Sequence, residues 1–218
     1  MLVMKQAGLV YLANPKTATQ SLRAALAPFA KVTPDQVKGK HINAKGYQSG
    51  WADFLTKRHE RVFRCFGVMR DPVDHAGSWY RYRQRDALKG HENSTQGMSF
   101  AEFIDARLAD DPPPFARIGR QDRFLGYLDD GDHPVDFVFD YAQLEVLQQF
   151  LHDRLGVVIE LPRHNVSPKV DADALVLPDD LMARFRAVHA NEFTLYTRVQ
   201  GTGMMTAQAQ HILNNSAH

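Results

Sequence analysis

The chain lacks several features that define common classes of protein. It has one cysteine, Cys65, in 218 residues, so an intramolecular disulfide cannot form. No apolar stretch approaches the roughly 20 residues that span a membrane, and the start shows no signal-peptide pattern. Lys and Arg number 26 against 25 Asp and Glu, and this net charge of +1 argues against a nucleic-acid-binding protein. We therefore expect a cytoplasmic protein without a membrane span, in which any anion site is local.

What is present is the composition of a globular domain, with 44% hydrophobic and 23% charged residues. Apolar runs alternate with segments of helical periodicity, an order typical of a parallel sheet covered by helices. The sequence therefore predicts an α/β fold in three layers, a single domain over residues 1–200 with a central, mostly parallel sheet flanked by helices. The small and polar residues of 201–218 predict a flexible C-terminal tail.

Capping residues define several element boundaries. Asp71 and Pro72 are typical of a helix start, Ser99 and Glu102 form a capping-box pattern, and Gly156 is a typical helix end. We expect strands at 9–13, 62–69 and 135–139, and helices at 19–29, 51–59, 72–88, 100–108, 144–155 and 178–196. Cys65 lies inside an apolar strand, which predicts a buried core residue.

The segment 9–22, LVYLANPKTATQSL, predicts a buried strand, a turn and a helix. The N–H groups at a helix start attract anions, and a lysine charge and hydroxyl donors add to that attraction. The segment is therefore either a phosphate- or sulfate-binding turn or an ordinary connection with polar capping residues. The residues that it would offer to an anion are Lys16, Thr17, Ala18, Thr19, Gln20 and Ser21.

A second cation, Arg70, follows the strand 62–69, and parallel sheets bind ligands beyond the carboxyl ends of their strands. Ser78 lies two helical turns further and can face the same cleft. The alternative is that Arg70 pairs with a surface carboxylate. For Arg81, Arg83 and Arg85, which come later on this helix, we expect a solvated face.

Together the two segments resemble the superfamily of sulfotransferases that use 3′-phosphoadenosine 5′-phosphosulfate (PAPS), in particular its carbohydrate-type and bacterial branch. The family's P-K-T-small-small-T/S-L element at the 5′-phosphosulfate is matched by PKTATQSL, residues 15–22. Its R-[D/N]-P-x-x-R-x-x-S-x-Y element at the 3′-phosphate is matched by RDPVDHAGSWY, residues 70–80. Weaker similarities at 135–144, 161–167 and 192–196 extend the resemblance over residues 1–199.

The resemblance also has departures. His75 stands where the family commonly has arginine, which predicts altered support around the 3′-phosphate. Gln20 replaces a common serine or threonine, and Ala142 and Gln143 replace acidic residues.

The resemblance implies a P-loop-like fold and a reaction. A sulfuryl group would pass in line from PAPS to a hydroxyl, less readily an amine, of a small-molecule or glycan acceptor, without a metal ion. The product of the donor is adenosine 3′,5′-bisphosphate (PAP). Lys16 and the N–H groups of residues 17–21 would stabilise the developing charge, and Arg70 and Ser78 would hold the 3′-phosphate.

A base is useful for deprotonating the acceptor hydroxyl. The candidate is His41 in GKHINA, residues 39–44, because an imidazole titrates near neutral pH; the alternative is a structural histidine in a polar loop. His59 and Glu60 are the other candidates. His164 is expected to line the acceptor or cofactor loop, and Lys169 either reaches the cofactor phosphates or is a surface lysine.

Two other functions are compatible with the sequence. A nucleotide kinase with a degenerate phosphate loop is disfavoured because G-x-x-x-x-G-K-[S/T] is absent and no glycine occurs between Leu9 and Lys38. A module that binds a nucleotide or glycan without turnover is kept open by the departures at Gln20 and His75. The loops 90–97 and 110–114 can shape an acceptor cleft, but their residues do not identify the acceptor. The carbohydrate-type resemblance favours a glycan or a glycan-like hydroxyl.

Overall fold

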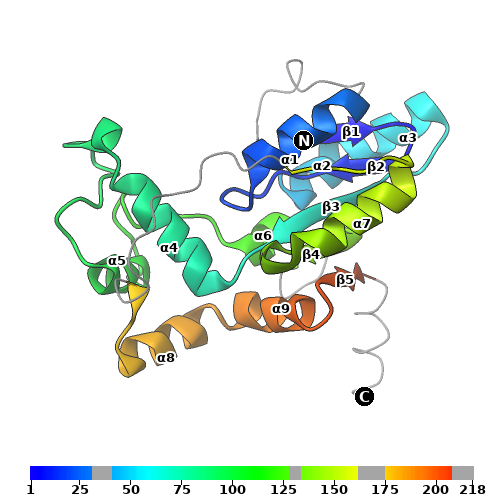
Figure 1. The fold of residues 1–218 in the computed structure, drawn as a ribbon. Helices are drawn as coiled ribbons and strands as arrows, with labels where there is room; N and C mark the ends of the chain where they lie inside the picture. The colour runs from blue at the N-terminus through cyan, green and yellow to red at the C-terminus, as the bar shows by residue number, and fades with distance from the viewer. Residues whose placement is uncertain (31–40, 128–133, 162–174, 208–218) are drawn as a thin grey trace.

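The computed structural model describes residues 1–30, 41–127, 134–161 and 175–207 (Figure 1). Within these residues a five-stranded sheet has the strand order β1-β2-β3-β4-β5. The three central strands run parallel, and each edge strand is antiparallel to its neighbour. The strands are β1 (Leu2–Met4), β2 (Leu9–Tyr11), β3 (Arg64–Met69), β4 (Phe137–Asp140) and β5 (Met204–Thr206). The predicted α/β class with a mostly parallel sheet is confirmed.

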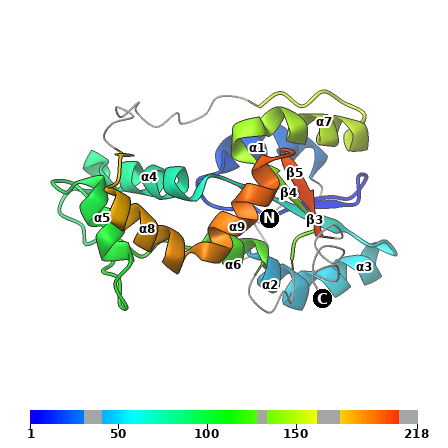
Figure 2. The same ribbon diagram turned by 90° about the horizontal axis from the view of Figure 1, so that it is seen from below.

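Both faces of the sheet are buried, because side chains alternate between two apolar clusters along each central strand. Val10, Cys65 and Val138 face one cluster, whereas Tyr11 and Phe66 face the other. The second cluster is completed by α1 (Thr19–Leu26) and α7 (Leu144–Leu155), and the first by α2 (Ala44–Tyr47), α3 (Asp53–His59), α6 (Gln121–Leu125) and α9 (Ala190–Gln200). Figure 2 shows α1 and α7 on the opposite side of the sheet from α2 and α3, which gives three layers.

A third apolar cluster lies beside the sheet, where α4 (Pro72–Arg83), α5 (Phe100–Arg107) and α8 (Asp179–Val188) meet (Figure 1). Phe103 and Phe185 are among its fully buried side chains. Asp71 caps α4 by accepting hydrogen bonds from the N–H groups of Val73 and Asp74. The predicted capping box at the start of α5 is present, and Gly156 ends α7 with a φ of 71°.

Several boundaries differ from the sequence prediction. The expected helix 19–29 ends at Leu26 and continues as a 3-10 turn, Ala27–Phe29, that contains Pro28. The expected helix 72–88 ends at Arg83, and Asp86–Leu88 forms a separate 3-10 turn. A π-helical turn, Gln48–Ala52, joins α2 to α3, and a 3-10 turn, Tyr141–Gln143, precedes α7.

The C-terminal part differs most. The expected helix 178–196 is two helices, α8 and α9, that meet at His189, whose backbone leaves helical geometry and whose buried ring contacts Phe185. Residues 204–206, inside the expected tail, form β5 on the edge of the sheet, so the prediction of a tail was wrong for them. Strand β1 was also missed, because three residues are too few to show a period. No helix in the described ranges is long and apolar enough to cross a membrane.

Candidate functional site

The turn after β2 has an unusual backbone. Lys16 and Ala18 have positive φ angles of 66° and 55°, a conformation that costs a residue with a Cβ atom about 1 kcal/mol. Ala18 is the N-cap of α1 and provides no side-chain cap, and the Leu22 N–H donates to the Ala18 carbonyl at 2.9 Å. Turns with left-handed residues can gather N–H groups into an anion-binding concavity. The backbone thus has the form expected of a phosphate-binding turn.

Polar side chains hold this turn from within. Thr17 is fully buried, and its hydroxyl donates to the Asn14 carbonyl at 2.8 Å. The Asn14 amide donates to the Val68 carbonyl at 2.9 Å and to the Gln121 Oε1 at 3.3 Å. The hydroxyl proton of Thr17, which we expected at the anion, therefore stabilises the turn instead. Thr19 and Gln20 lie in the first turn of α1, where Gln20 is exposed and Ser21 is buried.

Lys16 extends from the turn toward α4. Its Nζ lies 3.2 Å from the centroid of the Tyr82 ring and 4.6 Å from that of Trp79. An ammonium group over the face of an aromatic ring is stabilised by the ring quadrupole. The cation is thus held against the last turns of α4, at the end of the second predicted motif.

Arg70 joins the two motifs directly. One guanidinium N–H donates to the Lys16 carbonyl at 3.3 Å, and the guanidinium carbon lies 4.4 Å from the centroid of the Tyr141 ring. The backbone of Arg70 is fixed by Gln121, which accepts from its N–H at 3.0 Å and donates to its carbonyl at 2.8 Å. Ser78 is buried on α4, two turns beyond. The structure therefore brings the arginine of the second motif to the turn of the first.

Asp74, in the first turn of α4, faces Arg70, which precedes the helix. Its carboxylate forms an ion pair with the Arg70 Nε, and its other oxygen lies 3.6 Å from Arg81. The alternative for Arg70, pairing with a surface carboxylate, is thus present in the structure. The i, i+4 spacing of Arg70 and Asp74 is the signal in the sequence for this pair.

The expected solvated face was wrong for Arg81 and Arg83, whereas Arg85, beyond the end of α4, is exposed. Arg81 has a side chain only 11% exposed and faces Asp74. Arg83 is buried and donates to the carbonyls of Pro114, Phe115 and Arg117. Arg83 thereby ties α4 to the proline-rich segment after α5.

His75, where the family commonly has arginine, supports the turn rather than supplying charge. The side chain is buried, and its Nε2 donates to the Pro15 carbonyl at 3.1 Å. Burial is the largest cause that lowers the pKa of His75 to about 4; the charge of Glu192 opposes this and Arg107 adds to it. The ring is neutral at pH 7.

His41 lies at the end of β2. Its Nδ1 is 2.8 Å from the Ala13 carbonyl oxygen, which can only accept, so Nδ1 carries a proton and, in the neutral ring, Nε2 carries the lone pair. The side chain is exposed. This is the tautomer that a base needs. His59 and Glu60 instead lie at the end of α3, before β3 begins. This is the N-terminal end of the parallel strands, whereas the site lies at their C-terminal end. His164 and Lys169 lie outside the described residues.

Gln121 is the site residue that the sequence analysis missed. It is fully buried and contacts Asn14 and Arg70, which are 107 and 51 residues away along the chain. Its helix approaches β3 closely, since a Cβ at Gly67 would lie 2.4 Å from the Leu125 side chain. No local pattern identifies such a residue, because its partners follow two strands that are distant along the chain.

Comparison with protein-family models and with curated proteins gave no match. The chemistry of these residues therefore carries the functional inference.

Proposed function

We propose that the protein is a PAPS-dependent sulfotransferase with a P-loop-like turn at residues 14–19 that transfers a sulfuryl group to a hydroxyl. The observation that carries this proposal is the hydrogen bond from Arg70 to the Lys16 carbonyl. It brings together two cationic motifs that follow adjacent parallel strands, β2 and β3. PAPS has two anionic ends, so one such ligand can engage both motifs.

Each residue has a role in the proposed reaction. Lys16 and the start of α1 stabilise negative charge on the phosphate oxygen that leaves sulfur. Arg70 and Ser78 bind the 3′-phosphate. His41 accepts the hydroxyl proton at Nε2 while the acceptor oxygen forms its bond to sulfur and the bond from sulfur to the phosphate oxygen breaks. The carbohydrate-type resemblance makes a glycan hydroxyl the first acceptor to test.

Thermal unfolding with added nucleotides tests the donor site. PAP at about 100 times its dissociation constant adds about 2.7 kcal/mol of stability, or roughly 5–11 °C in the midpoint for a chain of this size. Adenosine 5′-monophosphate, which lacks the 3′-phosphate, is the matched ligand control. Arg70→Gln should reduce the preference for PAP over the monophosphate. Stabilisation by ATP with magnesium but not by PAP would favour the kinase alternative.

Transfer is tested with sulfur-labelled PAPS and a panel of glycan, alcohol and amine acceptors. We expect labelled product from the natural chain and none from Lys16→Ala. Arg70→Gln should mainly raise the KM for PAPS, because its contact is with the part of the donor that does not react. Tight PAP binding without transfer to any acceptor would instead favour the module that binds without turnover.

A further inference from the structure

One face of α4 carries side chains that contact the turn after β2. His75 and Trp79 are four residues apart and Tyr82 follows three residues later, so the three lie on the same side of the helix. His75 bonds the Pro15 carbonyl at 3.1 Å, which shows that this side of α4 faces the turn. The backbone of the turn lies against the start of α4, and the Lys16 side chain reaches the rings near its end.

Two aromatic rings contact the Lys16 ammonium there. Its Nζ lies 3.2 Å from the centroid of the Tyr82 ring and 4.6 Å from that of Trp79. The two rings are nearly perpendicular, with an interplanar angle of 89° and centroids 5.9 Å apart, so they form a corner. All three side chains belong to half-buried residues, and the attraction of a ring face for a cation is stronger where water is excluded.

The rings of this corner have further contacts. The guanidinium carbon of Arg83 lies 5.4 Å from the centroid of Trp79, and the same guanidinium donates to three carbonyls after α5. The guanidinium carbon of Arg85 lies 4.7 Å from the centroid of Tyr82. Lysine has a flexible four-carbon stem, and ordering it costs conformational entropy. A supported corner of two rings can hold such a side chain in one place.

A ring face differs from a carboxylate as a partner for lysine, because it carries no net charge. The contact with Tyr82 therefore restrains the Lys16 ammonium without cancelling its charge. Arg83 and Arg85 place two more positive charges beside the rings. Like charges repel one another, and an anion that arrives among them relieves this repulsion. The corner is thus suited to presenting the ammonium to an anionic donor.

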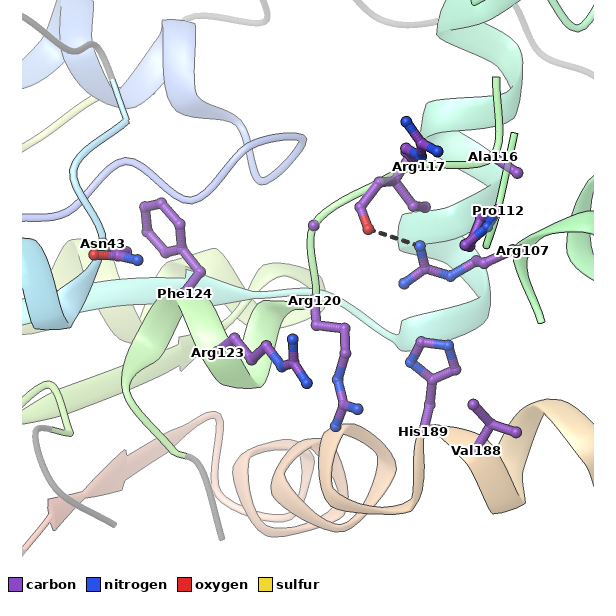
Figure 3. A pocket seen from close by; sticks show the side chains of 12 residues that line it. Asn43, Arg107, Pro112, Ala116, Arg117, Arg120, Arg123, Phe124, Val188 and His189 are labelled. Carbon is purple, nitrogen blue, oxygen red and sulfur yellow. Dashed lines mark hydrogen bonds between the residues drawn. The ribbon is translucent and has the colours of Figure 1, made fainter. Parts of the chain in front are cut away.

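The corner is separate from a cavity on the other side of α5 and α6. This cavity, of about 580 Å³, lies between α5, α6 and the junction of α8 and α9, and Figure 3 shows Arg107, Arg120 and His189 around it. Neither Trp79 nor Tyr82 is among the described residues that line it. The functional side chain that the two rings contact is therefore Lys16, not a group of the cavity.

We propose that Tyr82, with Trp79 beside it, is a positioning residue that holds the Lys16 ammonium for the leaving group of the donor. This role rests on the proposed function, in which Lys16 stabilises the charge that develops on the phosphate oxygen as its bond to sulfur breaks. A cation that is already held in place does not have to be ordered during the reaction, and this preorganisation lowers the barrier to the chemical step. The ring of Tyr82 carries the effect, and its hydroxyl does not.

Two substitutions of Tyr82 separate the ring from the hydroxyl. Tyr82→Phe keeps the ring, whereas Tyr82→Leu replaces it with an aliphatic group. In transfer from PAPS we expect Tyr82→Leu to lower kcat about tenfold and Tyr82→Phe to stay within about twofold of the natural chain, the size of one cation–π contact. The KM for PAPS should change less than kcat, because a preorganised charge acts mainly on the transition state. Phe54→Leu, which removes an exposed ring on α3, is the matched control.

NMR of the protein with ¹³C-labelled lysine reports on Lys16 without any need for activity. Protons above the face of an aromatic ring resonate upfield, and Lys16→Met identifies the Lys16 signal by its disappearance. We expect the signal of the Lys16 methylene next to Nζ to lie upfield in the natural chain and in Tyr82→Phe, and at the ordinary lysine position in Tyr82→Leu. Circular dichroism identifies a variant that does not fold, and Tyr82→Met, which also lacks a ring, replaces Tyr82→Leu in that case.

Several results would overturn the positioning role. They are an unchanged kcat in Tyr82→Leu, an equal loss in Tyr82→Leu and Tyr82→Phe, and an ordinary position of the Lys16 signal in the natural chain. A rise in kcat in Tyr82→Leu would also overturn it, because the rings would then hold Lys16 away from the donor. PAP binding and transfer by the natural chain are measured in parallel. Absence of both would refute the proposed function and this role with it, whereas their presence without an effect of Tyr82→Leu would refute this role alone.

Discussion

His75→Gln should remove a large part of the protein's sensitivity to mild acid. His75 has a pKa lowered from 6.5 to about 4 by burial, so unfolding allows the ring to take up a proton at any pH between these values. The folded state with its neutral, buried His75 ring has its full stability above about pH 6.5, and this stability is lost as the pH falls toward 4. A shift of this size makes the folded state about 2 kcal/mol less stable at pH 5 than at pH 7.5.

The substitution is designed to keep the hydrogen bond. A glutamine amide can donate to the Pro15 carbonyl as the His75 Nε2 does, but it does not titrate. Urea unfolding of both proteins, followed by tryptophan fluorescence, gives free energies of unfolding at pH 7.5, 6, 5 and 4.5. We expect the advantage of the natural chain at pH 7.5 to shrink by about 2 kcal/mol at pH 5.

Other titrating groups do not confuse this test. The lowered pKa of the Met1 amino group, about 6, has its effect between pH 6 and 8 and is common to both proteins. The lowered pKa of Glu192, about 2, has its effect below pH 4.5. His152→Gln, an exposed change on α7, is the matched control. A difference in stability between the natural chain and His75→Gln that is the same at pH 7.5 and pH 5 would refute the reasoning.

Three further predictions concern the site and its support. His41→Ala should lower kcat by roughly 10²–10⁴-fold without raising the KM for PAPS, as steady-state kinetics would show; an unchanged kcat would exclude it as the base. Asp74→Asn should tighten PAP binding about fivefold in titration calorimetry and leave adenosine 5′-monophosphate unaffected, since its carboxylate competes with the 3′-phosphate for Arg70. Weaker PAP binding would mean that Asp74 positions Arg70. Arg83→Met should lower the free energy of unfolding by about 2 kcal/mol, because three carbonyls lose their donor. Arg85→Met is the exposed control, and an equal loss in the two variants would contradict the proposed support.

Local signals predicted much of the fold. The caps at Asp71, Ser99 and Gly156 depend on residues within a few positions, and the structure places all three as expected. The expected single helix 178–196 is interrupted at His189, where the backbone leaves helical geometry, and the sequence pattern did not show this break. Strand β5 was not predicted, because it is defined by its long-range pairing with β4.

The candidate site was predictable only in its charged residues. Lys16, Arg70 and His41 have chemistry that draws attention wherever they occur, and the strand-end positions of Lys16 and Arg70 predicted that these two would meet. The neutral residues that hold them could not be predicted, because the partners of Asn14 and Gln121 are distant along the chain. The role of His75 depends on the loss of solvent around its ring, which a sequence does not show.

These neutral residues hold the turn without adding charge to it. An arginine or lysine that is fixed by a buried carboxylate has part of its charge neutralised, and breaking that pair to bind an anion costs free energy. In this site the turn is fixed by amide, hydroxyl and neutral imidazole groups of Asn14, Thr17, Gln121 and His75. Histidine at position 75 supports the turn as a neutral donor, whereas arginine would add a full charge. Asp74 is the exception at Arg70, and it is 42% exposed, so an arriving phosphate can displace it into water.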